Sequence, residues 1–148
     1  MDIKLREASE TDLPEILSLY SQLGEDDGTV LDPESARRIF ARFRDYPDYR
    51  IHVAVLDGKV VGAFALLVMD NLGHMGASSA ILEDVVVAEN LRGMGIGKRM
   101  MEHANELCRA KGCYKMTFSS NGNRLAAHRF YESLGFERHG FSFFVRYG

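Results

Sequence analysis

The pattern of apolar and polar positions divides the chain into short strands and amphipathic helices. Alternating or short apolar runs predict strands at residues 2–7, 50–56, 59–69, 81–87, 114–119 and 141–147. Helical spacing predicts helices over residues 13–23, from Pro33 to before Pro47, from Gly95 to about Lys111, and around Tyr131 up to Gly135. Asp57-Gly58 joins two of the strands and is typical of a two-residue hairpin turn. Strands interleaved with helices predict an α/β protein with a mixed sheet.

A strand, a glycine-rich loop and a helix follow one another between residues 81 and 110. The run Val85-Val86-Val87 is β-branched on both faces, as in a strand that is covered on both sides. After it come three glycines within five residues, Gly93, Gly95 and Gly97, and then apolar residues at helical spacing from Ile96. Such a loop directs backbone N–H groups into one concavity at a helix N-terminus, where anions such as phosphate bind.

Two known phosphate-binding loops do not match this stretch. A dinucleotide loop would need a third glycine at the position of Lys98. A P-loop would need Ser or Thr where Arg99 stands, and a glycine where Arg92 stands. What remains is Arg92-x-x-Gly95-x-Gly97 after an apolar strand. From the loop alone, a glycine-rich helix start without a ligand stays open as the alternative.

Two motifs together resemble the GNAT superfamily of acyl-CoA-dependent N-acyltransferases. Arg92-x-x-Gly95-x-Gly97 resembles the family's pyrophosphate-binding motif, and residues 123–136, with Phe130-Tyr131 and Gly135-Phe136, resemble its closing motif. The resemblance covers residues 80 to 140. It implies one N-acetyltransferase domain over residues 1–148, with a twisted mixed sheet of six to seven strands and helices on both faces.

Composition narrows the possible partners and the compartment. The net charge of −3 gives no basic field toward nucleic acid or an anionic membrane. No apolar segment approaches the roughly 20 residues of a membrane span, and the N-terminus lacks a signal-peptide pattern, so a cytoplasmic location is expected. Cys108 and Cys113 lack metal-ligand spacing and are expected to be reduced core thiols. No histidine shows metal-ligand spacing either, and we predict no metal.

The resemblance implies acetyl-CoA as the cosubstrate. Its diphosphate would lie on the N–H groups of the loop and first helical turn, and its pantetheine would pair with the strand at Val85, Val86 and Val87. The loop and turn positions are Arg92, Gly93, Met94, Gly95, Ile96, Gly97 and Lys98. Arg92 and Lys98 either neutralise phosphates or are solvated cations. Further coenzyme contacts are implied at Asn123, Ala127 and Phe130, although the family often has Asn where this chain has Arg124.

Acetyl transfer to an amine needs a base and an acid, because an alkylammonium has a pKa of about 10 and the thiolate leaves as an anion. Glu83 and Asp84 are neighbours on the central strand and are therefore expected to point to opposite faces. The resemblance favours Glu83 as the base, with Asp84 as an alternative and a structural ion pair as another. Tyr131 is the implied general acid, and a core tyrosine packed against Phe136 is the alternative.

The acceptor is expected to be a small-molecule primary amine. Positive charge gathers in and after the second helix, at Arg37, Arg38, Arg42, Arg44 and Arg50. These arginines either bind an anionic acceptor or form a solvated helix face. Residues 112–115 and 127–131 are similar to glucosamine-phosphate and aminoalkylphosphonate N-acetyltransferases. A protein N-acetyltransferase and a non-catalytic acyl-CoA-binding regulatory module stay open, and the aromatic last strand suits the edge of a homodimer.

Overall fold

The computed structural model describes residues 1–24 and 26–148, which divide into two compact units, Met1–Thr117 and Phe118–Gly148. The first unit contains the whole sheet and three of the four α-helices. Its strands are β1 (Lys4–Glu7), β2 (Tyr49–Leu56), β3 (Lys59–Met69), β4 (Ser78–Val87) and β5 (Cys113–Thr117). Its helices are α1 (Leu13–Tyr20), α2 (Pro33–Arg42) and α3 (Ile96–Ala110). The second unit contains α4 (Leu125–Ser133).

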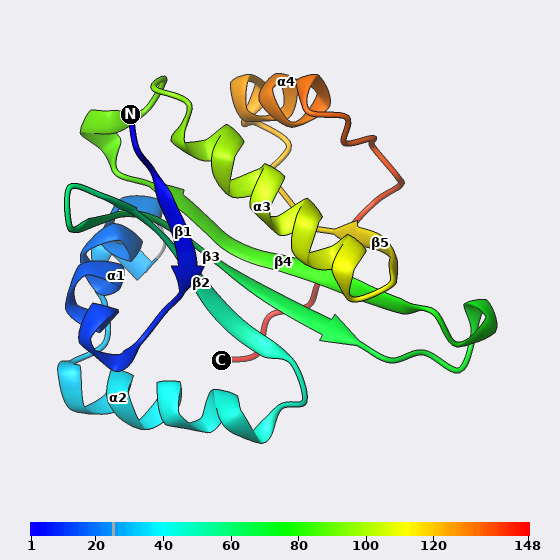
Figure 1. Ribbon diagram of the computed structural model, residues 1–148, viewed down its shortest axis with the longest axis horizontal. Helices are drawn as coiled ribbons and strands as arrows, with labels where there is room; N and C mark the ends of the chain where they lie inside the picture. The colour runs from blue at the N-terminus through cyan, green and yellow to red at the C-terminus, as the bar shows by residue number, and fades with distance from the viewer. Residues whose placement is uncertain (25) are drawn as a thin grey trace. The chain divides into compact units, whose positions relative to one another are not determined.

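The five strands form one open mixed sheet in the order β1-β2-β3-β4-β5 (Figure 1). The first three neighbouring pairs are antiparallel, and β5 runs parallel to β4. The β2–β3 hairpin turns at Asp57 and Gly58, whose φ angles are 51° and 76°. Two successive positive φ angles belong to a type I′ turn, so the hairpin predicted from Asp57-Gly58 is confirmed.

Helices cover both faces of the sheet, as predicted. On one face, α1 and α2 pack on the sheet, with Ile16 and Ala36 in one cluster with Val53 and Ala63. On the other face lies α3, whose Met100 Sδ would be 2.6 Å from a Cβ placed on Gly62 of β3. A side chain at position 62 would therefore force the Met100 side chain to move, so the glycine permits the close packing of α3 on β3. None of the helices described in residues 1–24 and 26–148 is long and apolar enough to cross a membrane.

An ion pair fixes the connection from β1 to α1. Asp12 is 5% exposed and accepts two hydrogen bonds from the Arg6 guanidinium, at 2.7 and 2.9 Å, and one from the Ser9 N–H at 2.7 Å. The Arg6 bonds, aided by Ser9, lower the pKa of Asp12 to about 2, although burial acts in the opposite direction. The paired charge holds the chain where it turns from the sheet edge into the first helix.

The predicted last strand does not form. Residues 137–148 contain no helix or strand, and the sheet has five strands where six to seven were expected. Phe141, Phe143 and Tyr147, which alternate as strand residues do, are about nine-tenths exposed at 90%, 92% and 89%. Alternation is a pattern that suits a strand, but a strand also needs a neighbour to receive its hydrogen bonds.

Candidate active site

A β-bulge interrupts β4 at the two carboxylates. Glu83 pairs with Ala65 and Val86 pairs with Ala63, so that Asp84 and Val85 together lie opposite the single residue Phe64. Asp84 has a φ of 52°, in the left-handed region that aspartate tolerates better than most residues. The bulge breaks the strict alternation from which opposite faces were predicted, and Glu83 and Asp84 are both exposed.

Two tyrosines from other elements lie within electrostatic range of Asp84. Burial, and then the charge of Asp84, raise the pKa of Tyr20 at the end of α1 well above its usual range. Burial also raises the pKa of Tyr49 at the start of β2, and the charges of Asp84 and Glu83 add to it. The pKa of Asp84 is itself raised by partial burial. Two phenols that stay protonated therefore lie near a carboxylate that binds a proton more readily than usual.

The tyrosine at position 49 is held in an aromatic cluster. Its ring stacks on Phe43 with centroids 4.3 Å apart, and Tyr46 meets it edge-on at 5.4 Å. Sequence reasoning assigned neither Tyr49 nor Tyr20 to the site. In the sequence, Tyr20 places a hydroxyl group at the end of an otherwise apolar face of α1. Only the tertiary structure brings this residue close to β2 and β4.

One edge of β4 has no strand beside it after the first four residues. The parallel pairing with β5 runs from Ser78 to Ile81, opposite Thr117, while β4 itself continues to Val87. Among the described residues, 1–24 and 26–148, the edge of β4 at Val85–Val87 therefore faces no other strand. Backbone N–H and C=O groups along such an edge can pair with an extended ligand.

The glycine-rich loop leads directly from this strand to α3. Gly93 and Gly95 have φ angles of 81° and 88°, and no heavy atom beyond their chain neighbours would lie within 4 Å of a Cβ at either. Gly95 is the N-cap of α3, no side chain caps the helix, and the first hydrogen bond runs from the Arg99 N–H to the Gly95 carbonyl at 3.1 Å. The amides before Arg99 are thus those that helix geometry leaves without an intrahelical acceptor. They form a positive, exposed helix end.

The basic residues of the loop are exposed. Arg92 and Lys98 make no ion pair in the part of the chain that the structure describes. Met94 is 48% exposed, while Ile96 turns into the core. The predicted coenzyme residues at Val85–Val87 and at 92–98 therefore all lie in the first unit, on the end of β4 and on the loop and first turn that lead into α3.

The remaining predicted residues lie in the second unit. Tyr131 is on α4, with its ring edge-on to Phe118 at 4.5 Å and to Phe136 at 6.1 Å. Burial raises the pKa of its phenol, against a smaller effect of Arg124. Asn123 is exposed in the turn before α4, where its N–H donates to the Asn121 side chain at 2.9 Å. Ala127 is half-buried and Phe130 is 37% exposed.

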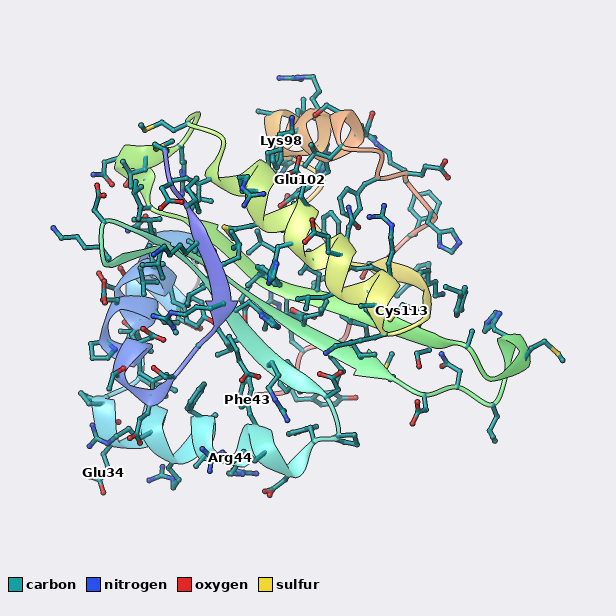
Figure 2. The ribbon with its side chains drawn as sticks, in the orientation of Figure 1. Glu34, Phe43, Arg44, Lys98, Glu102 and Cys113 are labelled. Carbon is teal, nitrogen blue, oxygen red and sulfur yellow. The ribbon has the colours of Figure 1, made fainter. Side chains whose placement is uncertain are left out.

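A pocket of about 490 Å³ opens between α2 and the ends of β1 and β2. Three of the five arginines singled out in the sequence line it, namely Arg37, Arg44 and Arg50, together with Glu7, Glu10, Phe40 and Phe43. Arg50 is held by Glu7, with Nε 3.1 Å from the carboxylate, and also donates to the Phe43 carbonyl. Arg37 and Arg44 make no ion pair among the described residues. In Figure 2, Phe43 lies between α2 and the sheet. Arg44 follows it in the 3₁₀ turn Phe43–Asp45, directly after α2.

The cysteines and histidines form no metal site in this part of the molecule. Cys108 is buried and Cys113 half-buried, and both are free thiols. Within residues 1–24 and 26–148 no group of three or more His, Cys, Asp or Glu side chains is arranged to hold a metal ion.

Known proteins resemble this chain over most of its length. The model of the Acetyltransferase (GNAT) family matches residues 13–136. This chain belongs to the GNAT acetyltransferase family. The glucosamine 6-phosphate N-acetyltransferase of Trypanosoma brucei brucei is 32% identical, over 94% of this chain and 92% of the relative. The aminoalkylphosphonate N-acetyltransferase of Salmonella typhimurium is 30% identical, over 95% and 88%.

Solved structures share the fold as well. A protein of Agrobacterium tumefaciens is 35% identical with a TM-score of 0.91, over 97% of this chain and 99% of the other. An acetyltransferase of Trypanosoma brucei is 29% identical with a TM-score of 0.86, over 99% and 100%. The GNAT chain described here is therefore an enzyme of the acetyltransferase class, with an α/β fold.

Proposed function

We propose that this GNAT enzyme moves an acetyl group from acetyl-CoA to the primary amine of a small, anionic molecule. The observation that most supports the proposal is the succession of three features along one stretch: the carboxylates at the bulge, the edge of β4 at Val85–Val87 that no described strand covers, and the N-terminus of α3 that no side chain caps. A thioester donor that has a diphosphate at one end and an extended pantetheine arm suits all three.

The diphosphate would bind the free amides between Gly95 and Lys98, with Arg92 and Lys98 as charge partners. The α3 dipole adds positive potential at the same point. The pantetheine arm would add to the edge of β4 along Val85–Val87 as a short extra strand. The acetyl carbonyl would then lie beside the bulge, with Asn123, Ala127 and Phe130 as further coenzyme contacts.

In the proposed reaction the amine attacks the thioester carbon, so that a C–N bond forms and the C–S bond breaks. A carboxylate takes the proton of the attacking amine, and the Tyr131 phenol gives its proton to the leaving thiolate. We assign the base to Glu83, with Asp84 as the competing candidate. The family resemblance favours Glu83. Asp84 stays a competitor because burial raises its pKa, and a carboxylate with a raised pKa is a stronger base.

The acceptor's anionic group is proposed to bind at Arg37 and Arg44. Both line the pocket against α2, and neither is neutralised by a carboxylate in the described part of the chain. Phe43 lines this pocket and also stacks on Tyr49, whose phenol is within electrostatic range of Asp84 and Glu83. The two relatives named above are an enzyme of an amino-sugar phosphate and one of aminoalkylphosphonates, which are both amines with a phosphorus oxyanion.

A screen of acetyl-CoA consumption tests the reaction and the acceptor class together. Matched pairs of amines are compared, namely glucosamine 6-phosphate with glucosamine and an aminoalkylphosphonate with the corresponding aminoalkane, and peptide N-termini are included. We expect kcat/KM to be at least about 100-fold higher for the phosphorylated members, because a bidentate arginine contact to an oxyanion is among the stronger polar interactions. Equal values within each pair would contradict an anionic acceptor, and turnover of peptides alone would indicate a protein acetyltransferase.

Arginine variants locate the anion. Arg44→Ala should raise KM for the phosphorylated acceptor by about 10-fold or more, whereas Arg42→Ala, at the last residue of α2 and outside the pocket, should leave it unchanged. Initial rates over a range of acceptor concentrations measure the difference. Equal effects of the two substitutions would mean that only the general positive charge of α2 and of the turn after it matters.

A further inference from the structure

The chain has two cysteines, and the fold brings them together at one end of α3. Cys108 lies in the last turn of α3, and Cys113 is the first residue of β5. Both belong to the first unit, and both are free thiols. Figure 2 shows Cys113 beside the C-terminal end of α3. Neither thiol has a role in the proposed acetyl transfer, so any chemistry between them is a separate property of the chain.

The end of α3 folds the chain back so that these two side chains meet. Gly112 follows the helix cap Lys111 with a left-handed φ of 71°, and its N–H donates to the Arg109 carbonyl at 3.1 Å. This bond is one of the two that define the Schellman ending of a helix. In that ending the third-last helical residue and the second residue after the cap commonly contact each other. These two positions are Cys108 and Cys113.

The pairing of β5 with β4 turns Cys113 toward the same space. Cys113 pairs with Ser78 and Met116 pairs with Ala80, so three steps along β5 match two along β4. Such a bulge shifts the alternation of side chains by one residue, and Cys113 and Met116 therefore lie on the same face of the sheet. The Cys108 Sγ is 3.7 Å from the Met116 Sδ, which shows that α3 covers this face. Cys108 and Cys113 thus lie close to one another, between the last turn of the helix and the start of the strand.

The two thiols differ in exposure. Cys108 is 6% exposed, whereas Cys113 is half-buried. Burial raises the pKa of the Cys108 thiol, and the neighbouring Cys113 raises it further. Because a thiolate is the nucleophile in disulfide exchange, Cys108 reacts slowly at neutral pH. A small oxidant therefore reaches Cys113 first, and Cys108 can attack only a sulfur that is already beside it.

We propose that Cys108 and Cys113 are a reversible dithiol pair, which a small-molecule disulfide of the glutathione class oxidises to a bond between α3 and β5. In the first step the Cys113 thiolate attacks one sulfur of the small disulfide, the S–S bond breaks, and one small thiolate leaves. In the second step the Cys108 thiolate attacks the Cys113 sulfur, and the second small thiolate leaves. Two electrons pass from the protein to the small disulfide, and the two protons of the protein thiols end on the two small thiols. Excess small thiol reverses both steps.

The bond would fasten the end of the helix to the sheet. A disulfide constrains the unfolded chain, and for a loop as short as this one it should raise the melting temperature by about 4–8 °C. The helix has 15 residues and is about 22 Å long, so its N-terminus is remote from the bond. The Kd for acetyl-CoA should therefore change by less than about twofold. The inference goes beyond the proposed acetyl transfer and does not depend on it.

Intact mass measurement of the full chain gives the first test. The protein is held in mixtures of oxidised and reduced glutathione, and its remaining thiols are then alkylated after unfolding. We expect the wild-type chain to end with no alkylated thiol and no glutathione adduct in the oxidised mixture, and with two alkylated thiols after excess reduced glutathione. Conversion of the mixed disulfide to this product should speed up by about 10-fold per pH unit between about pH 7 and 9, because Cys108 has to lose its proton.

Single substitutions identify the roles of the two thiols. Cys108→Ala should stop at one glutathione adduct on Cys113, because the second sulfur is missing. Cys113→Ala should gain no adduct over the same time, because Cys108 is buried. Thermal melts of the reduced and the oxidised wild-type chain measure the expected rise of about 4–8 °C.

A wild-type chain that keeps two alkylated thiols in the oxidised mixture, or that ends with glutathione on Cys113, would overturn the proposal. Disulfides found only between two chains would overturn it as well, and so would equal melting temperatures of the oxidised and reduced forms. Acetyl-CoA binding that is absent in both forms would count against the proposed function alone and leave the dithiol pair in place.

Discussion

The substitution Gly95→Ala separates the ligand role of the glycine-rich loop from its structural role. Gly95 is the N-cap of α3 at a φ of 88°, and a Cβ there would meet no heavy atom within 4 Å beyond its chain neighbours. The added methyl group therefore has room, and the cost of the substitution is the backbone conformation alone. For alanine in the left-handed region that cost is about 1–2 kcal/mol, which lowers the melting temperature by about 2–8 °C in a chain of this size.

The effect on the coenzyme should be larger than the effect on stability. If the substituted backbone relaxes toward negative φ, the amides before Arg99 turn away from the anion that they bind. A hydrogen bond to a charged group contributes about 1.5–3 kcal/mol, so the loss of one raises the Kd for acetyl-CoA by about 10- to 150-fold. Isothermal titration calorimetry at one temperature, well below the melting point of the variant, measures this change.

Gly112→Ala provides the matched control. Gly112 has a φ of 71°, also has no atom within 4 Å of a Cβ beyond its neighbours, and lies just beyond the other end of the same helix. Its replacement should cost the same amount of stability, about 1–2 kcal/mol, and leave the Kd for acetyl-CoA within about twofold. Equal Kd values for the two variants would refute the proposal that the amides at the N-terminus of α3 bind the coenzyme.

Three further substitutions test the remaining assignments. Tyr131→Phe should lower kcat by about 100-fold and leave the Kd for acetyl-CoA unchanged, because it removes the phenolic hydroxyl and keeps the apolar ring. An unchanged kcat would exclude the phenol as the acid. Glu83→Gln and Asp84→Asn should differ in their pH–rate profiles. The substitution that removes the base should lower kcat by at least about 100-fold and abolish the fall in rate at acidic pH. Normal profiles for both variants would exclude both carboxylates from the mechanism. Asp12→Asn should cost about 2 kcal/mol of unfolding free energy at pH 7. The pKa of Asp12 is depressed to about 2, so its contribution is present above about pH 4 and is lost as the pH falls toward 2, and urea melts of the variant should lack this loss.

Local chemistry was sufficient to predict much of the first unit. Asp57-Gly58 predicts its hairpin because few residue pairs accept two positive φ angles. The helical spacing of Ile96, Met100 and Ala104 predicts the face of α3 that packs on the sheet, and all three are buried. The glycine-rich loop was likewise predictable, because its conformation depends on residues that are adjacent in the sequence.

Features that depend on tertiary partners were not predictable in the same way. The bulge at Asp84 arises from the register between β3 and β4, and aspartate gives no local sign of a positive φ. The approach of Tyr20 and Tyr49 to Asp84 joins three elements that are far apart in the chain. The prediction of a last strand was wrong for a related reason: alternation at residues 141–147 suits a strand, but it does not specify a neighbouring strand to receive the hydrogen bonds.

The binding of acetyl-CoA to the wild-type chain tests the central claim most directly. Titration calorimetry should show one saturable site per chain, with acetyl-CoA and coenzyme A binding alike and dephosphorylated pantetheine binding at least about 100-fold more weakly, because the diphosphate would provide the main polar contacts. Equal affinity for the coenzyme and for pantetheine, or no detectable heat and no rise in melting temperature at saturating acetyl-CoA, would contradict the account.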